Sequence, residues 1–108
     1  MPKTELLRGT LDMLILRVLN AGERNGWDIA QRIEVLSKEA LKVEEGSLYP
    51  ALYRMEERGW IEWEWGQSEN NRKAKFYKLT RAGKKQLETE KEGWARVCTA
   101  IDQVMDSA

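Results

Sequence analysis

The sequence predicts a mainly α-helical protein with one small β-hairpin, and two kinds of periodicity carry this prediction. Apolar residues recur every three or four positions, the spacing of one helix face, over residues 4–21, 27–37, 46–58 and 80–105. Between the last two stretches, apolar and polar residues alternate along two short runs joined by a polar turn, which is typical of strands. The chain has 108 residues, the length of one small domain.

The first two helices are expected at Thr4 to Ala21 and Trp27 to Ser37, with Gly22 ending the first. The apolar stripe of the first helix is wider than one core contact needs, which predicts a second partner surface. It contains Leu6, Leu7, Leu11, Met13, Leu14, Ile15, Leu16, Val18 and Leu19. Helix, short turn and helix together are typical of the start of a helix-turn-helix unit.

The third helix is expected at Gly46 to Arg58, followed by Gly59 as its stop. Its buried back is predicted from apolar residues at helical spacing, namely Leu48, Leu52 and Met55. The exposed front then carries Gly46, Ser47, Tyr49, Pro50, Tyr53 and Arg54. Proline lacks a backbone N–H, so Pro50 is expected in or near the first turn, or at a kink.

The hairpin is expected over Glu62 to Leu79, with a polar turn at 67–72. Ile61, Trp63 and Trp65 alternate with glutamates in the first strand. Four tryptophans are expected to pack around the helical core and the hairpin base: Trp27, Trp60, Trp63 and Trp65. A helix followed by a hairpin predicts a winged helix-turn-helix domain over residues 1–79.

The last helix is expected to begin after Thr80 as N-cap and to reach Met105, a length of roughly 38 Å at about 1.5 Å per residue. Leu87, Trp94 and Ile101 recur every seven residues. This small core cannot cover so long a helix, so residues 80–108 are predicted to form a dimerisation helix. The predicted dimer interface comprises Leu7, Leu11, Leu87, Trp94, Val97, Cys98, Ile101 and Met105.

Charge is separated along a chain whose formal net charge is zero. Residues 72–85 contain seven basic side chains and no acid, which gives a local positive field suited to a polyanion such as DNA. The candidate DNA-binding residues are Ser47, Tyr49, Pro50, Tyr53, Arg54, Arg72, Lys73 and Lys75. Three alternatives stay open: the tyrosines are ordinary half-buried residues, Ser47 is a backbone cap, or the basic run is only a solvated surface.

Other function classes are disfavoured by residues that the chain lacks. It has one cysteine and no histidine, which excludes a Cys/His zinc site, an intramolecular disulfide and a histidine-based triad. Catalysis by carboxylates alone stays open, but the acids sit where solvated helix faces place them, so we expect no enzyme, no metal and no other cofactor. Arg8, Asp12 and Arg17 interrupt the first apolar stretch, so neither a membrane span nor a secretory signal is expected, and the location is predicted to be cytoplasmic.

The chain resembles the PadR-type transcriptional regulators in segments that cover most of its length: LLRGTLDMLILRVL, NGWDIAQRI, EEGSLYPALYRMEERGWI, EWGQSENNRKAKFYKLTRAGKKQL and EGWARV. Its single C-terminal helix is similar to the short subtype, and its wing to the acidobacterial PadR-like group. Trp27, Trp60 and Trp63 depart from the residues that are usual at these positions.

The resemblance implies a cytosolic homodimer that represses a nearby operon and is sometimes released by phenolic or planar hydrophobic effectors. In multidrug-responsive short members a tryptophan of the last helix stacks on the ligand, and Trp94 occupies the similar position, one turn before Cys98. The simpler interpretation of Trp94, and the one that the residues favour, is a plain interface anchor. The rival function is a winged-helix protein-interaction module without DNA binding.

Overall fold

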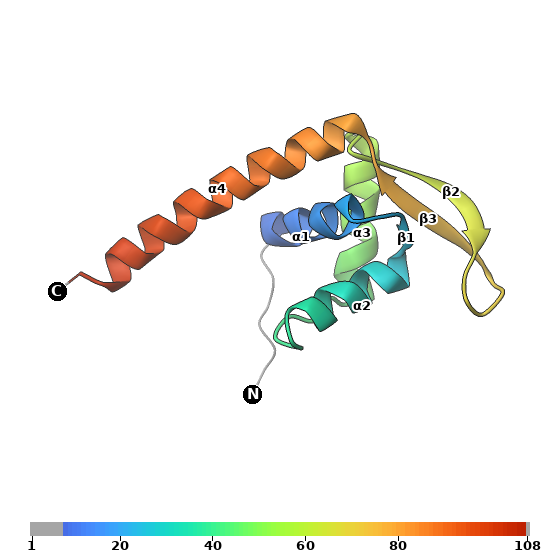
Figure 1. Ribbon diagram of the computed structural model, residues 1–108, viewed down its shortest axis with the longest axis horizontal. Coiled ribbons are helices and arrows are strands. Elements are labelled where there is room, and N and C mark those ends of the chain that lie inside the picture. Colours follow the sequence, from blue (N-terminus) through green and yellow to red (C-terminus); the bar gives the residue numbers. More distant parts are fainter. Residues whose placement is uncertain (1–7, 108) are drawn as a thin grey trace.

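The computed structural model describes residues 8–107, and this part of the chain contains four helices and a three-stranded sheet. In chain order the elements are α1 (Arg8–Asn20), β1 (Arg24–Asn25), α2 (Gly26–Leu36), α3 (Glu45–Glu57), β2 (Ile61–Gln67), β3 (Lys73–Leu79) and α4 (Arg81–Met105). Helices α1 to α3 pack together, the β2–β3 wing extends to one side, and α4 projects to the other (Figure 1). The predicted winged helix-turn-helix with a long C-terminal helix is confirmed.

The helix ends follow from local chemistry. The side chain of Asn25 caps α2 by accepting a hydrogen bond from the backbone N–H of Asp28 at 2.8 Å. Helix α3 is followed by Gly59 at φ 76°, a conformation that favours glycine. Its N-cap residue is Glu44 rather than Ser47, so the interpretation of Ser47 as a cap is wrong.

The sheet has the order β1-β3-β2 and is antiparallel throughout. In the wing, Ile61 pairs with Leu79 at the base and Gln67 with Lys73 near the tip. Strand β1 was not predicted, because two residues are too short to show any periodicity. It pairs with β3 and joins the start of α2 to the wing.

Helix α1 lies at the centre of the core and contacts α2, α3 and α4. Leu11 and Leu16 are therefore buried within the subunit, whereas Met13 and Leu14 of the same stripe are half-buried. Leu87 of α4 is 2% exposed in the same core. Leu11 and Leu87 thus leave almost no surface for a dimer contact, which corrects their predicted role. Leu7 lies outside the described residues.

Thr80 fastens the start of α4 to the end of α3. Its hydroxyl accepts a hydrogen bond from the Gly83 N–H at 3.0 Å and donates one to the Gly59 carbonyl at 2.6 Å. Backbone approach is so close here that a Cβ on Gly83 would lie 2.0 Å from the Trp60 carbonyl oxygen. The predicted N-cap is confirmed, and it fixes the direction in which α4 leaves the domain.

The tryptophans divide into two groups. Trp60 and Trp63 pack against the core as predicted. Trp27 and Trp65 are 64% and 54% exposed, so the prediction that they pack there is wrong. Trp27 lies in the first turn of α2, and Trp65 lies in β2 opposite Lys75, between the wing base and the tip.

Candidate nucleic-acid interface

The exposed face of α3 carries the residues that the sequence placed there, with the exception of Arg54. Its opposite face is fully buried through Leu48, Ala51, Leu52 and Met55. Tyr49 and Tyr53 are 47% and 62% exposed, and Ser47 and Pro50 are exposed beside them. Neither tyrosine is therefore an ordinary core residue. Pro50 lies inside α3 and has no N–H, so it cannot donate the usual helical hydrogen bond to the carbonyl of Gly46.

Tyr49 is held by the start of α2. A Cβ on Gly26 would lie 2.9 Å from the Tyr49 hydroxyl oxygen and 3.0 Å from a carbon of its ring. The missing side chain at Gly26 thus lets the Tyr49 ring lie against the α2 backbone. This contact was not predicted, because it joins residues from two helices.

Arg54 is directed toward α1 rather than outward. Its guanidinium donates a hydrogen bond to Asp12 Oδ1 at 3.0 Å, and Asp12 is only 6% exposed. Burial raises the pKa of the Asp12 carboxyl, although the charge of Arg54 opposes that shift. A buried carboxylate needs its partner, so this pair fastens α3 to α1. The DNA contact predicted for Arg54 competes with that pairing.

The two faces of the wing hold their lysines differently. On the face that continues from Tyr77 at the wing base, the Lys75 ammonium lies 4.2 Å from the Trp63 ring centre, and the Lys73 ammonium lies 4.6 Å from that of Trp65. On the other face, Lys78 forms an ion pair with Glu62 at 3.7 Å. Among the described residues no carboxylate forms an ion pair with Lys73 or Lys75. Their positive charge is therefore not cancelled locally.

A groove of about 950 Å³ separates the wing from α2 and α3. Tyr49 of α3 and Trp27 at the start of α2 line one side of the groove. The wing lines the other side with residues from both strands and the turn, including Trp65, Arg72, Lys73, Lys75 and Tyr77. Burial raises the pKa of Tyr77, so its hydroxyl is neutral at neutral pH. The groove thus collects four predicted residues, Tyr49, Arg72, Lys73 and Lys75.

Ser47, Pro50 and Tyr53 lie on the exposed front of α3 and do not line the groove. Trp27 and Trp65 do line it but were expected in the core. In the sequence, both tryptophans occupy positions whose spacing is typical of the core. The one sign against a core position was the number of tryptophans, since a core this small cannot surround so many indole rings.

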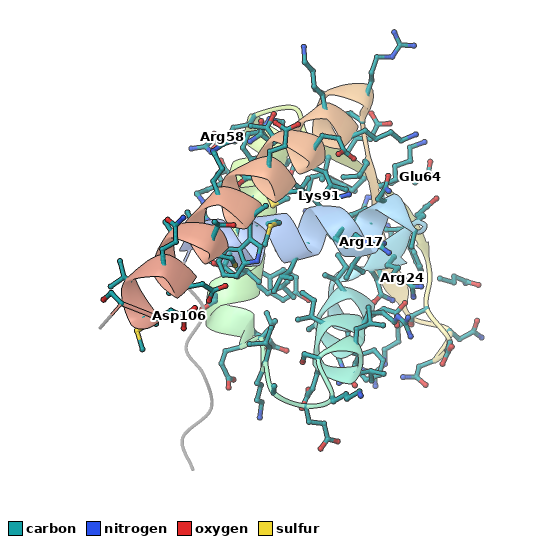
Figure 2. All side chains as sticks on the ribbon, turned by 60° about the vertical axis from the view of Figure 1, so that its left-hand side comes forward. Arg17, Arg24, Arg58, Glu64, Lys91 and Asp106 are labelled. Carbon is teal, nitrogen blue, oxygen red and sulfur yellow. The ribbon has the colours of Figure 1, made fainter. Side chains whose placement is uncertain are left out.

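The outer part of α4 exposes a second candidate surface. Trp94, Val97 and Ile101 are 44%, 48% and 52% exposed, Val104 and Met105 more so. Cys98 lies among them as a half-buried free thiol. Glu64 of the wing and Asp106 near the end of α4 lie on opposite sides of the molecule (Figure 2). The wing and this apolar surface are thus well separated.

Two negative findings concern residues 8–107. No group of three or more histidine, cysteine, aspartate or glutamate side chains is placed there to hold a metal ion. No helix in the same part of the chain is long and apolar enough to cross a bilayer.

Known proteins share both the sequence and the fold. The model of the transcriptional regulator PadR-like family matches residues 15–89, more than half of the chain. An uncharacterized protein of Lysinibacillus sphaericus is 32% identical over 106 residues, which are 98% of this chain and 97% of that protein.

Solved structures agree with this match. A PadR-like transcriptional regulator from Bacillus cereus has a TM-score of 0.79 at 30% identity and covers 97% of this chain and 100% of its own. A transcriptional regulator from Clostridium thermocellum has a TM-score of 0.82 at 28% identity, with 89% and 93% covered. A PadR family regulator from Clostridium difficile has a TM-score of 0.75 at 30% identity, with 88% and 97% covered. The chain therefore belongs to the PadR-like family of transcriptional regulators.

Proposed function

We propose that this regulator is a cytoplasmic homodimer that binds a DNA operator sequence-specifically and represses a nearby operon. The observation that carries the proposal is the position of the exposed α3 face next to a groove lined by Lys73 and Lys75. Helix α3 enters the major groove, where Tyr49 and Tyr53 meet base edges. The wing lysines and Arg72 contact flanking phosphates, which set the register without reading sequence.

The exposed apolar residues of α4 support the dimer. Residues 1–79 act as the DNA-binding unit, and the outer part of residues 80–108 packs against a second copy. The interface uses Trp94, Val97, Cys98, Ile101 and Met105, which remain accessible in the subunit. A two-fold dimer of this kind presents two α3 helices to half-sites separated by about 34 Å, one turn of DNA.

Trp94 and Cys98 are proposed as the effector site within this dimer. Two Trp94 rings near the two-fold axis enclose a planar apolar or phenolic molecule, in the offset stacking that aromatic rings prefer. Binding between the subunits changes the spacing of the two α3 helices and releases the operator. This step rests on the exposure of Trp94 and on the similarity to ligand-responsive family members.

Mobility-shift titrations test the DNA-binding role with the duplex upstream of the chain's own gene. Tyr49→Ala and Tyr53→Ala should each reduce discrimination between that duplex and random DNA by about 1–3 kcal/mol per base contact. Tyr53 is 62% exposed, so Tyr53→Ala should change the thermal midpoint little, whereas Tyr49→Ala should lower it slightly, because the Tyr49 ring lies against the α2 backbone.

Tyr77→Ala is the matched control, since Tyr77 is 5% exposed and its loss should lower the thermal midpoint strongly. If Tyr49→Ala and Tyr53→Ala instead behave like Tyr77→Ala and keep their site preference, α3 does not read bases. If the wild-type chain binds neither duplex, the result contradicts DNA binding and favours the rival function as a protein-interaction module.

A further inference from the structure

Three cationic side chains lie over three indole rings within residues 58–75: Arg58 over Trp60 at 5.1 Å, Lys75 over Trp63 at 4.2 Å and Lys73 over Trp65 at 4.6 Å. Significant cation–π pairs occur roughly once per 70–80 residues in folded proteins, so this density exceeds what ordinary packing supplies. We propose that Trp63 and Trp65 are positioning residues that hold Lys73 and Lys75 ready for DNA phosphates, an inference that rests on the proposed DNA-binding function.

The four residues Trp63, Trp65, Lys73 and Lys75 form a continuous set, which we call the lysine–tryptophan ladder. The rings of Trp63 and Trp65 meet edge to face, with centres 5.2 Å apart and planes at 78°. Lys75 lies within 6.0 Å of the Trp65 ring centre as well. Trp65 is therefore in contact with the other three members, and it lies in the groove between the wing and α3.

The ladder is fastened to the DNA-reading helix at its base. The indole N–H of Trp63 donates a hydrogen bond of 2.8 Å to Glu56 Oε1, and Glu56 belongs to α3. The orientation of Trp63 thus follows α3, and Trp65 and the two lysines follow Trp63. The ladder fixes where the ammonium groups stand relative to the exposed face of α3.

An indole ring suits this role because it orients an ammonium group without cancelling its charge. A carboxylate orients a lysine too, but it neutralises the field that attracts phosphate. The opposite face of the wing shows that arrangement, with Lys78 paired to Glu62. Lys73 and Lys75 stand two residues apart on one strand, about 7 Å, so each can reach a different phosphate.

The test is a thermodynamic cycle on a random-sequence DNA duplex, because phosphate contacts do not depend on sequence. Trp65→Leu is introduced into the wild-type chain and into a Lys73→Ala/Lys75→Ala background. We expect it to weaken binding about two- to fivefold in the wild type, as for exposed cation–π pairs, and to have no effect without the lysines. Trp65→Phe should restore most of the lost affinity, because phenylalanine keeps an aromatic ring. Lys78→Ala is the matched control, because it removes a lysine from the other wing face, where Glu62 and not an indole ring orients it.

An equal loss from Trp65→Leu in both backgrounds would overturn the inference, because the indole would then act on DNA or on folding directly. No loss in either background would overturn it too. The proposed function survives both results, provided that the wild type binds DNA. If the wild type does not bind the duplex, the proposed function fails and the ladder's role fails with it.

A second measurement needs no DNA. In the free protein the ε-methylene protons of Lys73 should show an upfield ring-current shift in NMR spectra, and Trp65→Leu should abolish it. An unshifted Lys73 resonance in the wild type would overturn the inference even if the protein binds DNA tightly.

Discussion

The two ends of α4 belong to different environments, although one apolar periodicity runs through both. At its start, Gly83 lies against the Trp60 carbonyl and Leu87 is buried in the subunit core. From Trp94 onward the large apolar side chains are 44–75% exposed, and the helix leaves the domain altogether (Figure 1). The contrast teaches that periodicity identifies the face of a helix that needs a cover but not the chain that provides it.

The largest effect is expected at the anchored end. Gly83→Ala places a methyl group against a backbone carbonyl that cannot rotate away, and should lower the free energy of unfolding by about 3 kcal/mol or more. Gly93→Ala in the same helix meets only the Arg96 guanidinium at 3.9 Å and should stabilise the protein by up to about 1 kcal/mol. Urea unfolding of both variants checks this, and equal effects would remove the distinction between the two ends.

The next largest effect is expected on dimer association through the outer end of α4. Ile101→Glu places a carboxylate in the proposed dimer interface, where burial costs several kcal/mol, so the dimer dissociation constant should rise about 100-fold or more. Gln103→Glu adds the same charge, and two residues along a helix it points away from Ile101. Sedimentation equilibrium compares the two variants. Unchanged association of Ile101→Glu would mean that another surface forms the dimer.

The smallest structural effect is expected from Trp94→Ala, which separates sensing from assembly. The variant should still bind the operator, because neighbouring apolar residues of α4 continue to cover the interface. It should lose any release from DNA by phenolic compounds or planar cationic dyes. If wild type and variant respond alike across such a panel, Trp94 is a packing residue only.

Much of the fold was predictable because local patterns determine it. Helix α3 was expected at 46–58 and lies at Glu45–Glu57, since Leu48, Leu52 and Met55 mark its buried face and Gly59 its end. The N-cap at Thr80 was predicted from the same kind of local signal.

The features that were missed depend on contacts between distant residues. Asp12 and Arg54 are 42 positions apart, and no local pattern joins them. The same holds for the contact of Tyr49 with Gly26 and for the two lysines over indole rings, because each joins residues of different elements. Leu87 was placed in the predicted dimer interface for the same reason. It shares the seven-residue spacing of Trp94 and Ile101, and the sequence does not show that the subunit core buries it.

Sedimentation equilibrium of the wild-type chain with the duplex upstream of its own gene tests the central claim most directly. A homodimer that places one α3 helix in each of two neighbouring major grooves predicts two chains per duplex, and two chains in free solution at micromolar concentration. One chain bound per duplex, or a monomer in the absence of DNA, would contradict the assignment of the outer part of α4 to a second copy.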